Sequence, residues 1–271
     1  MSKVKIIIVG AEGRMGRSLV SLVGQGENTE LAGAIVESTS TVLGQDAGTL
    51  ANGTAQGIEL TSDLTACLAE ANAVIDFSAP TGTIERMNAA FDNNCAYVIG
   101  TTGFTEDQKA EIYAATKAHA NGRLIFAPNF SVGINLLFEL CGKVASALGD
   151  DYDIEVVDMH HNQKVDAPSG TAEKLCEILC EARELSYKDN VAHGRFGLVG
   201  KRPKNEIGMH TLRGGDVVGD HTIVYATGGE RIELTHKASS RDTFSKGAIR
   251  AAVFLSSCEP GVYSMKEVLG L

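Results

Sequence analysis

The first part of the chain alternates between short apolar runs and segments with helical spacing. Apolar runs at residues 3–9 and 30–36 predict two buried strands. Between them, apolar residues recur every three or four positions over residues 15–23, which is the pattern of a helix with one buried side. A strand, a helix and a second strand in this order are typical of a parallel α/β sheet.

The same alternation continues to about residue 130. Each later strand is short and apolar, and each is followed by a loop and then by a helical segment. Thr105 and Gln108 have the spacing of a capping box, which marks the start of one helix. The strands are expected at 73–77, 97–99 and 124–126, and the helices at 83–93 and 105–120.

After residue 131 the pattern changes to strands that follow one another without helices. Alternating polar and apolar residues at 153–159 predict a half-buried strand, and three later strands are separated by glycine turns. With a long apolar helix at 132–148, they predict an α+β domain with an open, mixed four-stranded sheet. Such a sheet often forms an oligomer interface. The later strands are expected at 208–213, 221–226 and 230–236, a helix at 172–182, and a long loop at 188–204.

The expected fold class is therefore α/β, a Rossmann-like dinucleotide-binding domain joined to a second α+β domain. Helices at 243–257 and 264–269 are expected to pack back on the nucleotide domain. This predicts a dinucleotide-binding domain of residues 1–130 and 241–271, and a substrate-binding and oligomerisation domain of residues 131–240.

A glycine turn joins the first strand to the first helix. Gly10 permits a tight turn, Gly13 lets backbone amides reach a pyrophosphate, and Gly16 lets the helix pack against the sheet. Glu37 follows about 20 residues on, where a carboxylate accepts hydrogen bonds from the adenosine ribose. The spacing is GxxGxxG and not GxGxxG, so a plain glycine turn is the alternative. The flanking strands and Glu37 favour a dinucleotide site.

The residues around Glu37 bear on the choice of cofactor. Glu37 would repel the 2′-phosphate of NADPH, and Ser38 follows it in place of an arginine that could pair with that phosphate. Arg14 could still supply a positive charge nearby. NADH is therefore the favoured cofactor, with NADPH tolerated. An acid at Glu12 would be unfavourable beside a pyrophosphate unless its side chain points away.

Three loops after the later strands are further candidates for cofactor contacts. In an open parallel sheet, ligands bind at the carboxyl ends of the strands. Each loop alone could be an ordinary turn. Because all three lie at the same edge of the sheet, we expect them to contact the cofactor. They span residues 78–82, 100–103 and 127–130.

A short segment after the strand at 153–159 concentrates groups that exchange protons. His160, His161 and Lys164 lie between the end of this strand and the start of a helix. A single histidine or lysine in such a place is usually structural or solvated. Three of them within five residues favour a functional site.

The helix start that follows is suited to bind an anion. Pro168 disfavours helix at the residue before it, and Ser169 or Thr171 can cap the helix. A helix N-terminus offers free N–H groups and about half a positive charge, so a carboxylate or phosphate would bind well there. Gly170 lets the backbone come close to that ligand.

Composition and charge limit the classes of partner. The formal net charge of −10 argues against nucleic acid. The longest apolar runs are too short to cross a membrane, and no cleavable signal pattern is expected. The six cysteines form no CxxC pair, and Cys176 and Cys180 share an apolar helix face, so core thiols in a reducing cytoplasm are expected.

Six segments together resemble the dihydrodipicolinate reductase family, now called 4-hydroxy-tetrahydrodipicolinate reductase. The resemblance runs essentially from end to end, and HHNQKVDAPSGTA is its most specific segment. The segments are VGAEGRMGR, IDFSAPTGT, VIGTTGF, APNFSVGIN, HHNQKVDAPSGTA and THKASSRDTF.

The resemblance implies a reductase of lysine and diaminopimelate synthesis that transfers hydride from NADH or NADPH to a cyclic, unsaturated dicarboxylate, with loss of water. It implies that His160 donates or accepts a proton, that Lys164 donates one, and that His161 contacts substrate. Gly170 and Thr171 would hold a substrate carboxylate. The implied cofactor contacts are Gly10, Ala11, Glu12, Gly13, Arg14, Met15, Glu37, Gly100, Thr101, Thr102, Ala127, Pro128, Asn129 and Phe130.

The resemblance also implies a cytoplasmic homotetramer built through the sheet of the second domain. Ser169 at the helix start and Arg241 are added as candidate substrate contacts, because two substrate carboxylates call for N–H groups and cations. Hydride addition to a conjugated imine leaves an enamine anion, and a nearby ammonium or imidazolium can protonate it.

Other functions remain open from the residues alone. A metal-dependent hydrolase would need a third ligand beside His160 and His161, and no spacing supports one, so no metal is expected. A sensor that binds NADH without turnover would usually have a DNA-binding segment or a basic face. A reductase acting on another imine or keto acid is the nearest rival.

Overall fold

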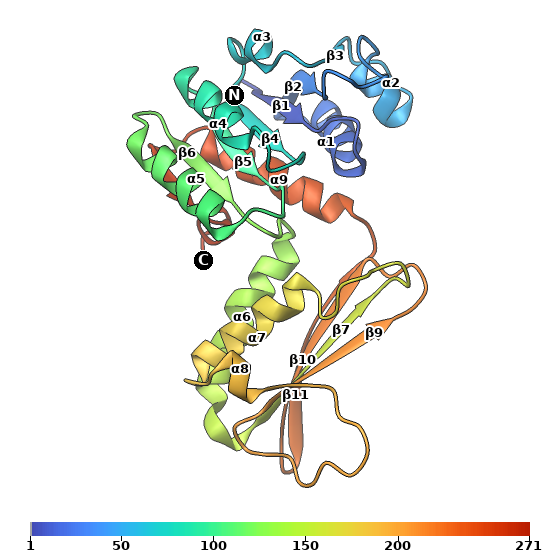
Figure 1. Ribbon diagram of the computed structural model, residues 1–271, viewed down its shortest axis with the longest axis vertical. Coiled ribbons are helices and arrows are strands. Elements are labelled where there is room, and N and C mark those ends of the chain that lie inside the picture. The colour runs from blue at the N-terminus through green and yellow to red at the C-terminus, as the bar shows by residue number, and fades with distance from the viewer. Residues whose placement is uncertain (1) are drawn as a thin grey trace. The chain divides into compact units, whose positions relative to one another are not determined.

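The structure, a computed structural model, describes residues 2–271 and divides into two compact units (Figure 1). The first unit contains the residues up to Val132 together with Asp242–Leu271, and the second is Gly133–Arg241. The first contains a seven-stranded sheet and the second a five-stranded sheet. The expected fold class, a Rossmann-like domain with a second α+β domain, is confirmed.

The sheet of the first unit is parallel throughout, in the order β12-β6-β5-β4-β1-β2-β3. Along β1, Ile6 and Ile8 belong to one apolar core and Ile7 and Val9 to another, which explains why this strand is apolar at every position. The strands are β1 Val4–Val9, β2 Thr29–Ile35, β3 Leu60–Thr61, β4 Ala73–Asp76, β5 Ala96–Ile99, β6 Arg123–Phe126 and β12 Gly261–Tyr263.

Helices cover both faces of this sheet. Leu19 of α1 and Ala248 of α9 pack in one core, and Met87 of α4 and Ile112 of α5 pack in the other. The capping box expected at Thr105 is present at the start of α5. The helices are α1 Arg14–Gln25, α2 Ala47–Asn52, α3 Leu64–Leu68, α4 Thr83–Asp92, α5 Glu106–Ala118, α9 Asp242–Leu255 and α10 Met265–Leu269. The short elements α2, α3, β3 and β12 were not expected, because segments of two to six residues show little periodicity.

The second sheet has the strand order β11-β10-β7-β9-β8, with β7 antiparallel to β10 and parallel to β9. The expectation of four strands was wrong by one, because β8 lies within the segment expected to be a long loop and is only three residues long. Helices α6 and α7 pack on this sheet. The elements are α6 Val132–Leu148, η1 Gly149–Asp151, β7 Asp153–His160, α7 Gly170–Ala182, α8 Tyr187–Asn190, β8 Val191–His193, β9 Ile207–Arg213, β10 Gly219–Thr227 and β11 Glu230–Ala238.

One helical stretch within residues 2–271 is long and apolar enough to cross a membrane by length and composition, Val132–Asp151. No single apolar run within this stretch is that long, because Glu139 and Lys143 interrupt it. Its buried side chains pack in the core of the second unit, as in the core helix of a soluble protein. They are Ile134, Leu137, Cys141 and Ala145.

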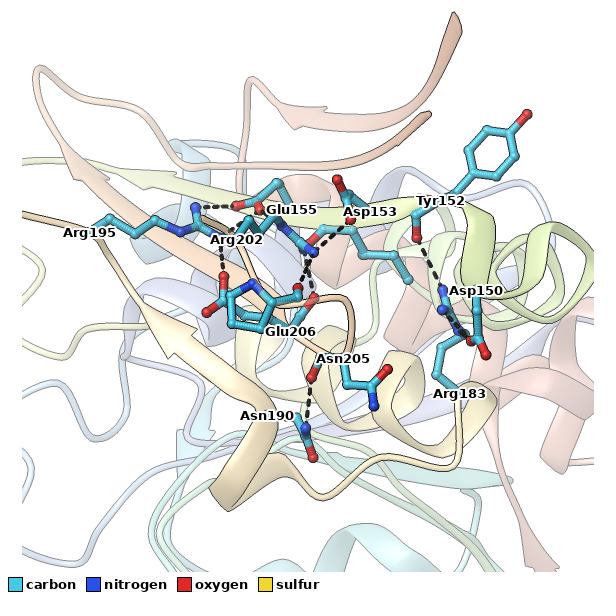
Figure 2. Close-up of polar contacts among 12 residues, drawn as sticks. Asp150, Tyr152, Asp153, Glu155, Arg183, Asn190, Arg195, Arg202, Asn205 and Glu206 are labelled. Atoms are coloured by element: carbon cyan, nitrogen blue, oxygen red, sulfur yellow. Dashed lines mark hydrogen bonds and ion pairs between the residues drawn. The ribbon is translucent and has the colours of Figure 1, made fainter. Parts of the chain in front are cut away.

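A network of ion pairs fixes the two ends of the loop at residues 194–206 to β7 (Figure 2). Arg195 and Arg202 both reach Oε1 of Glu155 at 2.8 Å, and Nε2 of His210 lies 2.6 Å from Oε2 of that carboxylate. Burial alone would raise the pKa of Glu155. The hydrogen bonds from these three residues outweigh burial and lower the pKa to about 2. The loop is thus anchored at its base.

The turn after β1 generates a test of the fold. A Cβ atom added at Gly16 would lie 2.1 Å from the carbonyl oxygen of Gly10, so Gly16→Ala must push α1 away from the sheet. We expect a loss of about 1–3 kcal/mol, read as a fall of roughly 2–4 °C in Tm per kcal/mol by calorimetry. The matched control is Gly13→Ala. Gly13 has φ −69°, and its added Cβ would lie 3.3 Å from the carbonyl oxygen of Gly10, which requires only a small shift, so Tm should fall less than in Gly16→Ala. Equal Tm values for both variants would contradict the close packing at Gly16.

Candidate active site

The glycine turn at the start of α1 has the geometry of a dinucleotide-binding turn. Gly10 has φ +80°, and a Cβ there would lie 2.4 Å from the carbonyl oxygen of Phe77. The amides of Gly10 and Ala11 donate to the carbonyl of Ile35, which ties the turn to β2. Gly13 is the N-cap of α1, has no side chain to cap it, and is exposed. The first amides of α1 are therefore open to an anion.

A pocket of about 880 Å³ opens beside this turn, within the size range of small-molecule sites. Gly10, Glu12, Gly13 and Glu37 line it, all of them expected cofactor contacts. The carboxylate of Glu12 accepts a hydrogen bond of 2.7 Å from Ser40, which gives this acid a partner other than a pyrophosphate. The other lining residues are Val9, Ile35, Val36, Ser38, Thr39, Ser62, Leu64, Phe77, Ser78, Ala79, Thr81 and Arg86.

A buried carboxylate holds two of the expected loops in place. Asp76, at the end of β4, has no exposed surface, and its Oδ1 accepts hydrogen bonds from the Ser78 hydroxyl (2.5 Å) and the Thr101 hydroxyl (3.2 Å). Its Oδ2 accepts from Tyr97 at 2.7 Å and Arg86 at 3.1 Å. The loops at 78–82 and 100–103 are therefore fixed by one charge.

The remaining expected cofactor residues divide between surface and core. Thr101, Thr102 and Pro128 line a second pocket of about 270 Å³. A Cβ at Gly100 would lie 2.1 Å from the ring of Phe77, so this position is close-packed. Ala11, Ala127 and Phe130 are buried, Arg14 is exposed, and Met15 and Asn129 are half-buried. The side chains of the buried three support the turns rather than line a pocket.

In the second unit, His160 is the last residue of β7, and the loop after it is held by backbone hydrogen bonds. The amide of His161 donates to Val217 at 2.7 Å, and the amide of Gly214 donates to His160 at 2.9 Å. Nζ of Lys164 lies 2.8 Å from Oδ2 of Asp166. The structure thus brings His160, His161 and Lys164 onto one short, fixed loop.

The loop ends at the N-terminus of α7. Ser169 caps the helix, because its hydroxyl accepts a hydrogen bond from the amide of Ala172 at 3.2 Å; of the two expected caps, Ser169 is the right one. Gly170 is exposed, and an added Cβ there would meet no atom within 4 Å. Thr171 is half-buried in the first turn. Open space therefore lies in front of a capped helix end. Arg241 is exposed at the end of the unit.

Sequence reasoning missed three residues that surround His160. Asp158 is fully buried, and its Oδ1 lies 2.9 Å from Nδ1 of His160 and 3.3 Å from Nε2 of His221. Its Oδ2 lies 3.3 Å from Arg213. The alternation of buried and half-buried residues along β7 could have revealed Asp158. This residue and His160 follow Ile154 on the buried face of the strand.

Asp158, His160 and His221 also have the composition of a metal site, with ligating atoms within 4.8 Å of one another. This set differs from the pair His160 and His161 considered from the sequence. The Arg213 guanidinium and the Ser169 amide and hydroxyl already donate to the same carboxylate. A cation would have to compete with these donors, so the geometry favours a hydrogen-bonded cluster.

Comparison with known proteins is decisive for the family. Residues 4–130 match the family described as "Dihydrodipicolinate reductase, N-terminus", and residues 133–269 match "Dihydrodipicolinate reductase, C-terminus". The chain belongs to the dihydrodipicolinate reductase family.

Individual members of this family agree along the whole chain. The protein is 45% identical over 267 residues to a 4-hydroxy-tetrahydrodipicolinate reductase of Anaeromyxobacter dehalogenans, and the match covers 98% of each chain. It is 47% identical over 266 residues to the enzyme of that name from Chromobacterium violaceum, again with 98% of each covered. A dipicolinate-bound dihydrodipicolinate reductase from Paenisporosarcina sp. TG-14 shares the fold, with a TM-score of 0.77, 24% identity and 98% of each chain covered.

As a member of the dihydrodipicolinate reductase family, the protein is an NAD(P)H-dependent oxidoreductase. The uncapped helix start at Gly13 and the pocket at Glu37 suit the phosphates and ribose of such a cofactor.

Proposed function

We propose that this protein reduces 4-hydroxy-tetrahydrodipicolinate to tetrahydrodipicolinate in lysine and diaminopimelate synthesis. The nicotinamide cofactor supplies the hydride, one proton is taken up and one water is lost. The observation that carries the proposal is the loop from His160 to Thr171, which joins an imidazole, an ammonium and an open helix N-terminus in one unit. The full-length relatives are named for this reaction.

His160 and Lys164 would serve the proton steps. His160 is about nine-tenths buried beside Asp158, and Lys164 is held next to Asp166 with a fifth of its side chain exposed. An imidazole and an ammonium on a loop of fixed backbone can each deliver a proton to a substrate placed against that loop. His161 follows His160 directly and would contact the substrate.

The helix start would bind a substrate carboxylate. Gly170 and Thr171 occupy the first positions of α7, and Gly170 is exposed with open space beside it. Ser169 would keep this helix start in place through its cap. Arg241 would add a cation for the second carboxylate, which we infer from its charge and exposure alone.

In the first unit, the glycine turn and the pocket at Glu37 would bind the cofactor, with NADH favoured and NADPH accepted. Glu37 is exposed on the lining of the pocket, and Ser38 and Thr39 follow it on the same lining. A carboxylate there suits two ribose hydroxyls and opposes a 2′-phosphate.

The chain would work as a cytoplasmic homotetramer. The anchored loop of residues 194–206 presents Phe196, Leu198 and Val199 to solvent, the first two almost fully exposed (Figure 2 shows the anchor). Three apolar side chains on a loop with a fixed base are suited to bury against a second copy of the chain. The free thiols fit a reducing compartment.

The first test is a coupled assay with the aldol product of pyruvate and aspartate semialdehyde, following loss of reduced cofactor by absorbance. His160→Gln and Lys164→Ala should each lower turnover by roughly two to four decades, because each removes a proton donor. Dissociation constants for NADH, measured by fluorescence, should stay within about twofold, since the proposed cofactor site does not include either residue. Normal turnover in either variant would refute its role. No turnover in the unmodified protein, with intact NADH binding, would favour a related imine or keto-acid reductase or a sensor.

Glu37→Ala tests the cofactor assignment. The variant should bind NADH about tenfold more weakly, because it loses the charge-assisted hydrogen bonds to the ribose. NADPH binding should weaken less or improve, because repulsion of the 2′-phosphate is relieved. The two dissociation constants are measured side by side by fluorescence titration. Equal weakening for both cofactors would rule out the ribose contact.

Sedimentation velocity tests the assembly. The unmodified protein should sediment as a species whose mass is four times the 28.6 kDa of one chain. Phe196→Asp should shift the distribution to smaller species, because a charge in an apolar contact is costly. Leu43→Asp, a charge at an exposed apolar position of the first unit, is the matched control and should leave the mass unchanged. A monomeric unmodified protein would overturn the assembly proposal.

A further inference from the structure

One buried carboxylate contacts both halves of the proposed substrate site. Asp158 lies near the carboxyl end of β7, on the face that packs in the core with Ile154 and Val156. In the register of the sheet, Asp158 lies opposite His221 of β10 and opposite Thr211 of β9. A carboxylate with no exposed surface must take its hydrogen-bond partners from the protein.

The two oxygens of Asp158 have different partners. Oδ1 lies 2.9 Å from Nδ1 of His160, 3.3 Å from Nε2 of His221, and accepts a hydrogen bond of 2.8 Å from the Ser169 hydroxyl. Oδ2 accepts from the Ser169 amide at 3.1 Å and from Arg213 at 3.3 Å. The carboxylate thus joins the imidazole of His160 to the cap of α7.

This contact determines which nitrogen of His160 can exchange a proton with a ligand. Because Nδ1 faces the carboxylate, Nε2 is the nitrogen left for the substrate. Nε2 packs toward Gly219 of β10, where an added Cβ would lie 3.0 Å from this nitrogen. Because residue 219 is a glycine, it adds no side chain at this approach to Nε2.

The contacts of Asp158 favour its charged form. Burial alone would raise its pKa, but the close contacts with His160, His221 and Ser169 outweigh burial and hold the pKa far below its usual range. A fixed negative charge favours the protonated form of an adjacent imidazole. Arg213 from β9 and His221 from β10 also face this charge. His236 on β11 lies near His221, and its own pKa is lowered by burial and then by the charge of His221.

We propose that Asp158 is the positioning residue of the substrate site. Its carboxylate orients His160 with Nε2 toward the substrate and, through Ser169, fixes the start of α7 that receives a substrate carboxylate. The inference rests on the proposed function of His160 and the helix start. Asp158 itself touches no substrate.

Asp158→Asn tests this inference, because the amide keeps the size of the carboxylate and removes its charge. We expect turnover to fall by about two decades. The alkaline limb of the turnover–pH profile should move to lower pH, because a neutral amide stabilises an adjacent positive charge less than a carboxylate does. Asp158→Glu restores the charge and should recover the unmodified limb and most of the turnover.

The matched control is Glu155→Gln on the opposite face of the same strand. Its carboxylate is also paired with cations, but its partners are Arg195, Arg202 and His210. The alkaline limb of the turnover–pH profile of Glu155→Gln should match that of the unmodified protein. An unmoved limb in Asp158→Asn, with turnover within threefold, would overturn the inference. Lost turnover with an unmoved limb would also overturn it, since that is the result of a merely structural role.

A measurement on the unmodified protein keeps the inference testable if Asp158→Asn does not fold. Nitrogen-15 spectra of the histidine side chains, with His160 assigned by comparison with His160→Gln, should show a proton on Nδ1 of His160, the nitrogen that faces Asp158. Protonation at Nε2 alone would overturn the inference. Full turnover in His160→Gln would instead refute the proposed function, so the two failures are distinguishable.

Discussion

A carboxylate removed from water must be surrounded by donors, and each unit of this protein contains one such carboxylate at the end of a central strand. Asp76 ends β4 and Asp158 lies near the end of β7, and neither has exposed surface. A buried charge without partners would cost several kcal/mol, so neighbouring strands, helices and loops must supply them. The hydroxyl donors Ser78, Thr101 and Ser169 come from loops that are expected to bind ligands.

This constraint explains how short, glycine-rich loops keep a defined shape. The loops after β4 and β5 are joined through Asp76, because Ser78 and Thr101 donate to the same oxygen. The loop after β7 is joined to α7 through Asp158 and Ser169. In both units the strand positions the carboxylate and the carboxylate positions the loop. Removing one partner would leave the others around an uncompensated charge, which is why such networks tolerate change poorly.

Features that depend on neighbours in sequence could be predicted from the sequence. The glycine turn at residues 10–16, the capping box at Thr105 and the cap of α7 each involve residues within a few positions of one another, and their expected geometry is observed. The strand β8 was missed because three residues show no alternation, and its pairing with β9 joins distant segments. The hydroxyl of Ser40 beside Glu12 was also missed, because it lies 28 residues further along the chain.

The site of the second unit was only half predictable for the same reason. His160 and Lys164 can be recognised in the sequence because residues that exchange protons are concentrated there. His221 and Arg213 come close only because β10 and β9 pair with β7. Pairing register depends on tertiary packing, which a single sequence does not reveal. Yet a polar residue on the buried face of an alternating strand is itself informative. Asp158 interrupts the series that begins Ile154 and Val156, and such a break requires partners from other strands.

Arg213 and Lys164, two cations near His160, differ in how firmly they are held, and this difference suits their roles. Arg213 pairs with a carboxylate that has no exposed surface, and it also donates to the carbonyl of Asp166, so it is fixed. Lys164 pairs with Asp166, whose side chain is 55% exposed. An ion pair open to water contributes little stability, so the ammonium can exchange its partner for a substrate at small cost. The fixed charges therefore define the shape of the site, while the ammonium proposed to deliver a proton stays free to move to the substrate.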